Sequence, residues 1–138
     1  MKIIVCVEDN NGMMFNKRRV SQDIAVREDI YKNLGDKKLI MNGYSFKMFK
    51  DDNSGKNIVV EENLPIEDKD NFQFIEDKKL SEFESSIDEL IIYYWNRRYP
   101  SSLKFDIDVL NGNWQIVSEE EFVGKSHEKI TKKIILRK

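Results

Sequence analysis

The sequence contains few of the residues that build covalent links or metal sites: it has one cysteine, one histidine, two prolines and six glycines in 138 residues. A single cysteine excludes an internal disulfide. Cys6 lies in the apolar run IIVCV, so we expect it to be a small buried residue of a protein from a reducing compartment. With His127 as the only histidine and no cysteine cluster, we expect no metal site.

Long apolar runs and a strong net charge are also absent. No stretch approaches the roughly 20 apolar residues that a helix needs to span a bilayer. The N-terminal apolar run is short and breaks at Glu8 without the small-residue cleavage site of a signal peptide, so we expect a cytoplasmic protein without membrane contact. The 23 basic and 25 acidic residues leave a net charge of −2, which argues against a general affinity for nucleic acid.

The composition is that of one soluble globular domain. Hydrophobic residues make up 40% and charged residues 35% of the chain, and its length is enough for one core without disulfides or metals. We therefore expect a single domain over residues 1–138. Apolar runs rich in β-branched residues alternate with short amphipathic segments, which favours an α/β fold.

The first half of the chain gives the clearest elements. A buried strand is expected at residues 3–7, followed by a loop that contains an apolar group at residues 13–15, suited to covering a pocket, contacting a protein or packing under the loop. A helix is expected from about residue 22 to residue 34, with Ser21 as its N-cap and Gly35 as its C-cap. A strand at residues 38–41, a turn at Asn42 and Gly43, and a short helix through Phe49 follow.

The second half contains one segment that fits two interpretations. Residues 78–97 fit either one long amphipathic helix or a short helix at about 78–85 followed by a strand, and the β-branched and aromatic density after Asp88 favours the second interpretation. From Leu103 onward the pattern is that of antiparallel strands: LKFDIDV alternates, GNWQIVSEEEF follows an Asn-Gly turn, and EKITKKIILRK alternates again.

Four stretches, taken in chain order, resemble dihydrofolate reductase. IIVCVEDNNG is similar to the first strand of that family and the loop after it, and DIYKNLGDKKLIMNGYSF to its helix and to the strand and turn that usually read Met-Gly-Arg-x-Thr-Trp. FQFIEDKKLSEF and DELIIYYW resemble its short helix and central strand, and NWQIVSEEEF with SHEKITKKIILRK its closing hairpin. The resemblance implies a three-layer α/β fold: a twisted, mostly parallel sheet, an antiparallel C-terminal strand, and helices on both faces.

The family's catalytic carboxylate has no direct match. In dihydrofolate reductase hydride passes from a reduced nicotinamide cofactor to a pterin, which a carboxylate on the first helix holds. The alignment puts Val26 or Arg27 at that position, so Asp23 and Glu28 are the nearest catalytic candidates. A residue three or four positions away lies on a different helical turn, and Asp23 is also explained as a favourable acid in the first turn of a helix.

The cofactor contacts implied by the resemblance are partly kept. Asn42, Gly43 and Ser45 lie where the family meets the cofactor phosphates, and Ser45 matches a threonine whose hydroxyl suits a phosphate at a helix N-terminus. Gly43 replaces an arginine that normally engages the cofactor. The family's later Gly-Gly pair, which lets the cofactor approach, is replaced here by Tyr94 and Trp95, which would fill that space.

Two basic clusters, NKRRVS and NRRYP, would lie at the ligand-binding end of such a sheet. They predict a site for an anion or a protein partner formed by Lys17, Arg18, Arg19, Arg97, Arg98 and Trp95. The alternative is that they are solvated loop charges beside core aromatics. Serine, aspartate and His127 are present for a hydrolytic triad, but no nucleophile-elbow motif is, which argues only weakly against one.

The sequence therefore predicts a non-catalytic accessory or binding protein on a dihydrofolate-reductase-like fold, which binds a small anionic ligand or a protein partner and needs no cofactor. One alternative is an NADPH-dependent reductase of a pterin-like substrate with a displaced site. The other is a nucleic-acid-binding accessory protein that uses the basic clusters. Whether the chain is an enzyme and what its oligomeric state is stay open at this point.

Overall fold

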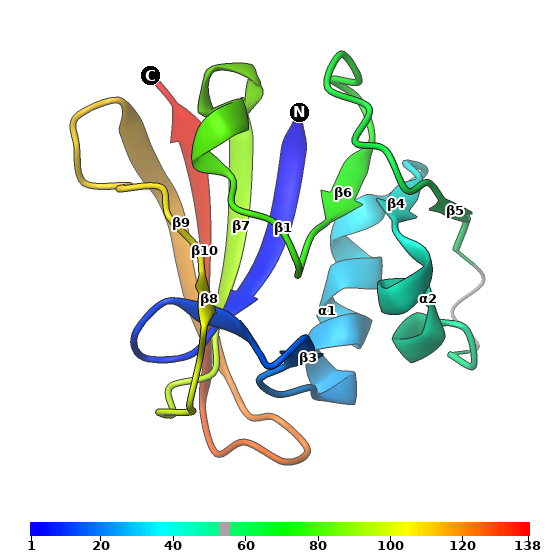
Figure 1. Cartoon of the computed structure of the whole chain (residues 1–138), viewed down its shortest axis with the longest axis vertical. Coiled ribbons are helices and arrows are strands. Elements are labelled where there is room, and N and C mark those ends of the chain that lie inside the picture. The colour runs from blue at the N-terminus through cyan, green and yellow to red at the C-terminus, as the bar shows by residue number, and fades with distance from the viewer. Residues whose placement is uncertain (53–55) are drawn as a thin grey trace.

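The computed structural model describes residues 1–52 and 56–138. Within these residues the chain forms a seven-stranded sheet, a three-stranded sheet, two α-helices and one 3-10 helix (Figure 1). In chain order, the elements are β1 (Lys2–Val7), β2 (Gly12–Phe15), β3 (Arg18–Arg19), α1 (Ile24–Leu34), β4 (Leu39–Met41), α2 (Gly43–Phe49), β5 (Ile58–Val60), β6 (Phe72–Phe74), η1 (Ser81–Ser86), β7 (Glu89–Tyr94), β8 (Leu103–Lys104), β9 (Trp114–Phe122) and β10 (Ile130–Arg137).

The larger sheet is mixed and has the strand order β5-β4-β6-β1-β7-β10-β9. The first five strands in this order are parallel, whereas β10 runs antiparallel to both β7 and β9. β1 and β7 are nearly continuous buried runs, as expected for parallel strands that are covered on both faces. The predicted α/β fold, mostly parallel with antiparallel strands at its C-terminal end, is confirmed.

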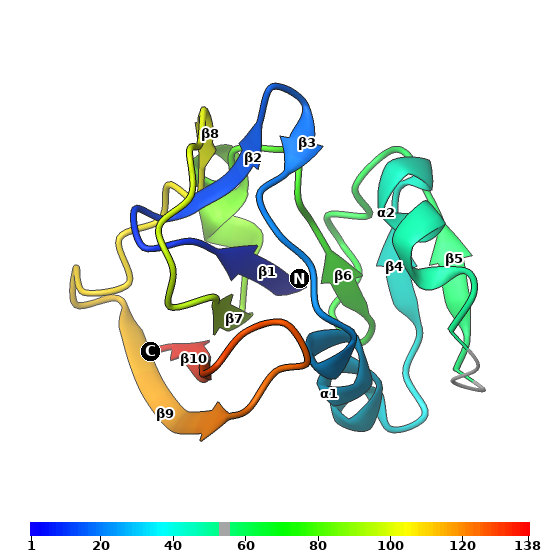
Figure 2. The same cartoon turned by 90° about the horizontal axis from the view of Figure 1, so that it is seen from below.

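Helical elements cover both faces of this sheet. Viewed from below, α1 lies on one side, and η1 lies with the small sheet on the other (Figure 2). Val26, Ile30 and Leu34 of α1 pack in one core cluster. Leu80 and Ile87, which flank η1, pack in the other cluster, so the predicted three-layer arrangement is confirmed.

The prediction of a loop between β1 and α1 is wrong in one respect, because this segment contains the hairpin of β2 and β3. Met13 and Met14 are buried against the main sheet, while Phe15 is partly exposed. The turn residues Asn16 and Lys17 both have positive φ, 49° and 64°, and connect the paired residues Phe15 and Arg18. Two positive φ values at a two-residue turn are typical of the type I′ hairpin turn.

This turn gives a stability prediction. Replacing Lys17 by glycine is expected to raise the free energy of unfolding by about 0.5 kcal/mol, since relief of roughly 1 kcal/mol of left-handed strain exceeds the greater unfolded-state entropy of glycine. Urea unfolding measures the change. Asn16→Gly is the matched control and should gain less, because asparagine tolerates this conformation. A Lys17→Gly protein less stable than the parent would contradict this account of the turn.

Three other sequence predictions can be compared with the observed elements. The short helix and strand over residues 78–97 are confirmed as η1 and β7. The N-cap of α1 is Asp23 and not Ser21, whereas Gly35 is the C-cap as predicted. LKFDIDV forms a strand only at Leu103–Lys104. Its alternation reflects the burial of Phe105 and Ile107 and not strand pairing.

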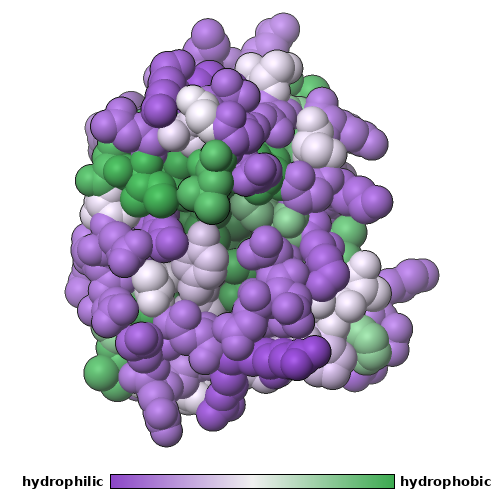
Figure 3. Space-filling model, turned by 90° about the vertical axis from the view of Figure 1, so that its left-hand side faces the viewer, coloured by the Kyte–Doolittle hydropathy of each residue, from purple (hydrophilic) through white to green (hydrophobic). Residues whose placement is uncertain are grey.

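The β9 edge of the larger sheet carries exposed apolar side chains. β9 is its last strand, and Leu110, Ile116 and Val117 are exposed on or beside it. Apolar surface gathers in one region on this side of the molecule (Figure 3). The acidic run at residues 119–121 lies on the same strand, where charge disfavours edge-to-edge pairing. None of the helices in the described residues is long and apolar enough to cross a membrane.

Candidate functional site

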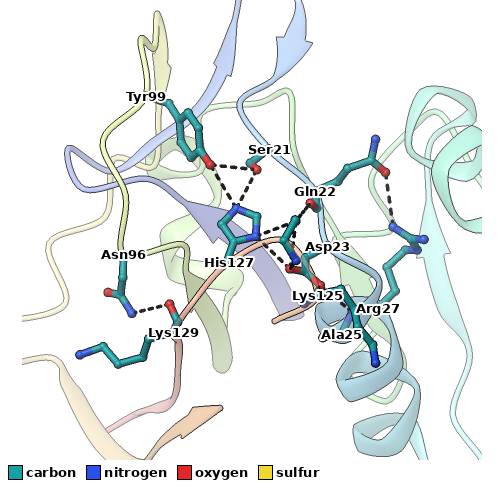
Figure 4. Close-up of polar contacts among 11 residues, drawn as sticks. Ser21, Gln22, Asp23, Ala25, Arg27, Asn96, Tyr99, Lys125, His127 and Lys129 are labelled. Carbon is teal, nitrogen blue, oxygen red and sulfur yellow. Dashed lines mark hydrogen bonds and ion pairs between the residues drawn. The ribbon is translucent and has the colours of Figure 1, made fainter. Parts of the chain in front are cut away.

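The loops at one end of the parallel strands bring together side chains that are far apart in the sequence. This is the lower end in Figure 1, where the β2–β3 hairpin, the start of α1, the loop after β7 and the loop between β9 and β10 meet. A cluster at this end consists of Ser21, Asp23, Tyr99 and His127, and Figure 4 shows their polar contacts. The C-terminal ends of parallel strands are the usual place for ligands in open α/β sheets.

Asp23 ties the start of α1 to the loop between β9 and β10. As N-cap it accepts a hydrogen bond from the amide of Ala25 at 2.8 Å. It also accepts from the amides of Lys125 and Ser126, at 3.0 and 2.9 Å. The side chain is buried, with the residue 4% exposed. Backbone amides therefore take the place of water as hydrogen-bond donors to the carboxylate.

Asp23 also orients His127. Oδ2 of Asp23 lies 2.9 Å from Nδ1 of His127. Burial raises the pKa of Asp23, but the hydrogen bonds from His127 and from the backbone amides outweigh it and hold the pKa well below its usual range. An ionised carboxylate only accepts hydrogen bonds, so Nδ1 of His127 carries a proton. With Nδ1 protonated, Nε2 is the acceptor in the neutral form of the ring.

Two hydroxyl groups face this Nε2 atom. The Oγ of Ser21 is 2.9 Å from it and the Oη of Tyr99 is 3.1 Å from it. The two hydroxyl oxygens lie 3.3 Å apart. The cluster therefore has a hydroxyl, an imidazole and a carboxylate in the order that nucleophilic hydrolases use.

Trp95 fixes the plane of the imidazole. Its ring stacks on that of His127 with centroids 4.5 Å apart and 24° between the planes. Trp95 is buried, with 3% of the residue exposed. Trp95, which the sequence predicted as part of an anion or partner site, is thus in contact with His127.

Glu8 positions Tyr99 from the end of β1. Its buried carboxylate accepts hydrogen bonds from the amides of Gly12 at 2.6 Å and Asn10 at 3.0 Å, and from the amide of Tyr99 at 3.4 Å. Burial raises the pKa of Glu8, but these amides outweigh it and lower the pKa overall. The loop that carries Tyr99 is therefore held against the turn after β1.

A second cluster lies at the end of β6. Glu76 is buried and accepts two hydrogen bonds from the guanidinium of Arg19, at 2.9 and 3.1 Å, and one from the hydroxyl of Ser45 at 2.7 Å. The guanidinium also lies 4.5 Å from the centroid of the Tyr44 ring. Arg19, predicted as an anion ligand, already has a carboxylate partner.

The residues predicted to meet a cofactor phosphate are all bonded to acidic side chains. Ser45 donates to Glu76, Asn42 donates through Nδ2 to Asp77 at 3.0 Å, and Gly43 donates its amide to Glu62 at 2.9 Å. Asn42 is also the N-cap of α2. A phosphate at this helix end would meet carboxylates, which oppose its negative charge.

The other catalytic candidate, Glu28, is exposed on α1. The buried side chain of Val26 lies beside a cavity that is small. Val26 lines a cavity of about 10 Å³ together with Ile30, Phe49, Phe74 and Trp95, which is close to the volume that a single water needs. Cys6 also lines it. Burial, and secondarily the charge of Glu76, raises the pKa of the Cys6 thiol, which leaves it a poor nucleophile.

The basic residues line separate hollows. Arg18 and Arg19 line a hollow of about 510 Å³ with Phe15, Asn16, Val20, Tyr99 and Pro100. Arg97 lines another of about 250 Å³, with Trp95, Asn96, His127, Glu128 and Lys129. Lys17 and Arg98 are exposed and line neither.

Metal binding has no support in the described residues, since no group of three or more histidine, cysteine, aspartate or glutamate side chains in them could hold an ion. The sequence did not identify the Ser21, Asp23 and His127 cluster, because His127 lies 106 residues from Ser21. The only local signal was that the single histidine follows a turn at Gly124.

Comparison with known proteins supports the fold. No family model matches the chain, and no curated protein matches it either. Among solved structures, the dihydrofolate reductase of Enterococcus faecalis complexed with NADP(H) and RAB-propyl matches 99% of this chain and 95% of that chain with a TM-score of 0.66 and 9% sequence identity. The chain therefore has a dihydrofolate-reductase-like fold, as the resemblance of the sequence predicted.

Proposed function

We propose that this protein binds a small organic anion in the hollow beside Arg18 and does not act as a nicotinamide-dependent reductase. The observation that carries the proposal is the charge of this hollow. Arg18 and Arg19 line it without any carboxylate among the lining residues. Arg19 is neutralised by Glu76, whereas Arg18 forms no ion pair within the described residues.

The hollow also has the mixed chemistry of a small-molecule site. Phe15, Val20 and Pro100 supply apolar surface, and the phenol of Tyr99 and the amide of Asn16 supply polar groups. Ligand sites commonly combine apolar walls with a few polar groups that fix orientation. An aromatic or aliphatic carboxylate suits this combination, because its apolar body can contact the walls while its charge pairs with Arg18.

Two features weigh against the reductase alternative. The similar Enterococcus faecalis structure contains NADP(H), but here the amides and hydroxyls at the start of α2 are bonded to carboxylates. The cavity lined by Val26, Phe49 and Trp95 measures about 10 Å³, far below the several hundred Å³ of a typical ligand pocket. These features support a binding protein that does not use NADPH.

Binding of benzoate and phenyl phosphate, measured by calorimetry, tests the proposal, with neutral benzamide as the uncharged comparison. We expect Arg18→Ala to weaken binding of both anions about tenfold, which corresponds to about 1.4 kcal/mol. Lys17→Ala is the matched control, since Lys17 is a basic residue of the same turn that does not line the hollow, and should bind as the parent does.

Two results would overturn the proposal. Equal affinity for benzamide and benzoate, or an Arg18→Ala protein that binds as tightly as the parent, would remove Arg18 as the ligand-binding cation. Tight binding of NADPH together with its oxidation on addition of a pterin would establish the reductase alternative instead.

A further inference from the structure

We infer that Ser21, His127 and Asp23 form a hydrolytic relay in which Ser21 is the nucleophile and a small carboxylic ester is the substrate. This inference goes beyond the proposed binding function and does not depend on it. It rests on the two 2.9 Å contacts that join the Oγ of Ser21 to Nε2 of His127 and Nδ1 of His127 to Asp23 (Figure 4).

The carboxylate meets the requirements of the orienting acid. Asp23 is buried and accepts from three backbone amides besides the imidazole, which keep it ionised. An acid in this role does not take up the proton itself. It holds the imidazole in one tautomer and stabilises the imidazolium that forms during reaction.

The imidazole is equally constrained. Stacking on Trp95 fixes its plane, and the bond to Asp23 fixes its rotation within that plane. The rigid placement of a general base is what allows proton transfer to contribute to rate. Its Nε2 atom faces only the hydroxyls of Ser21 and Tyr99 within the described residues.

Ser21 differs from the other two members because it is partly exposed. The connection between α1 and the loop at residues 125–127 is made by Asp23, through the amides of Lys125 and Ser126. In the part of the chain that the structure describes, the hydroxyl of Ser21 bonds only to His127 and Tyr99. A partly exposed hydroxyl that is bonded to a buried imidazole is the arrangement of an activated nucleophile.

Tyr99 supplies the hydrogen-bond donor that a developing oxyanion needs. Its phenol oxygen is 3.3 Å from the Oγ of Ser21. Tyr99 lines the hollow of about 510 Å³, whereas Ser21 lines the small cavity beside α1. An ester carbonyl attacked by Ser21 would lie beside the phenol. Donation from the phenol then stabilises the negative charge as it forms on the carbonyl oxygen.

The reaction balances with water as the only co-reactant. The Oγ of Ser21 forms a bond to the carbonyl carbon, and its proton moves to Nε2 of His127. The bond to the alcohol oxygen breaks, and the alcohol leaves with that proton. Water then attacks the acyl group on Ser21, gives its proton to Nε2, and releases the carboxylic acid as the proton returns to Ser21.

Reaction of the full chain with a fluorophosphonate probe tests the nucleophile directly. We expect one equivalent of phosphonyl group, located on Ser21 by peptide mass spectrometry, with release of fluoride. Ser21→Ala should gain no mass. Ser102→Ala is the matched control and should react as the parent does, since Ser102 is an exposed serine of the loop after β7 that makes no contact with His127.

Hydrolysis of p-nitrophenyl acetate separates a relay from a merely structural cluster. We expect the rate to fall at least about 100-fold in His127→Gln, as for loss of a general base, and about tenfold in Tyr99→Phe, which keeps the ring. Circular dichroism and urea unfolding confirm that each variant is folded.

Failure of the inference is distinguishable from failure of the proposed function. A folded parent protein that gains no phosphonyl mass, a label on another residue, or equal hydrolysis by Ser21→Ala would overturn the relay whether or not benzoate binds. Labelling of Ser21 without any anion binding would establish the relay and leave the Arg18 site unsupported.

Discussion

Replacing Asp23 by alanine is expected to lower the free energy of unfolding by about 4 kcal/mol. The substitution removes the N-cap of α1, and this alone costs about 1 kcal/mol. It also leaves the amides of Lys125 and Ser126, whose bonds to Asp23 are partly buried, without their acceptor. Each of these amides should cost about 1 to 2 kcal/mol, in the lower part of the range for unsatisfied groups. Equilibrium unfolding in urea measures the loss.

Asp106→Ala is the matched control for this prediction. Asp106 also accepts from two amides and one hydroxyl, those of Leu80 and Ser81, but it is exposed, so water can replace its contacts. We expect a loss of about 1 kcal/mol there. Equal losses in the two variants would show that burial of Asp23 adds nothing to its contribution.

The pH dependence of stability follows from the same carboxylate. The pKa of Asp23 is lower in the folded protein than in the unfolded chain, because the hydrogen bonds from His127 and the amides outweigh the effect of burial. Its contribution is therefore complete above the unfolded pKa, near about 3.9, and is lost as the pH falls through the folded pKa. The stability difference between the parent and Asp23→Asn should shrink as the pH is lowered from 7 to below about 4.

The order of the elements could be predicted because each element has a local signature. β1 and β7 are dense in β-branched and aromatic residues, which is typical of strands that are buried on both faces. Gly35 ends α1 with a positive φ of 58°, a conformation that favours glycine. Such signals lie within a few residues of one another and need no knowledge of the tertiary structure.

The N-cap of α1 could not be predicted from local signals alone. Ser21 and Asp23 are both good N-caps, and the sequence alone favoured the wrong one. The choice is made by the loop at residues 125–127, whose amides bind Asp23, and this loop lies 102 residues or more further along the chain. The same contact frees Ser21 to bond to His127. The candidate site was therefore missed because its members meet only in the folded chain.

The ion pairing of the basic clusters could not be predicted from the sequence either. Arg18 and Arg19 are adjacent and chemically identical, yet Arg19 is bonded to Glu76 and stacked on Tyr44, whereas Arg18 is exposed. Both side chains line the same hollow, but only Arg19 reaches the buried carboxylate at the end of β6. The sequence gives no local signal for this contact, because Glu76 lies 57 residues further along the chain.

The Glu76 cluster leads to the second large effect. Replacing Glu76 by alanine is expected to lower the free energy of unfolding by about 3 kcal/mol, because it leaves the partly buried guanidinium of Arg19 and the buried hydroxyl of Ser45 without their acceptor. Glu119→Ala is the surface control. Its carboxylate lies 3.6 Å from the ammonium of Lys133 and is 55% exposed, so the loss there should stay below about 1 kcal/mol.

A double-mutant cycle separates pairing from packing in this cluster. Arg19→Met and Glu76→Ala together should cost less than the sum of the single substitutions, with a coupling of about 2 kcal/mol, because the second change removes a charge that the first has left unpaired. Urea unfolding of the four proteins gives this coupling. Additive losses would mean that Arg19 is stabilised chiefly by its contact with Tyr44, and the carboxylate at Glu76 would then be only a neighbour of the guanidinium and not its partner.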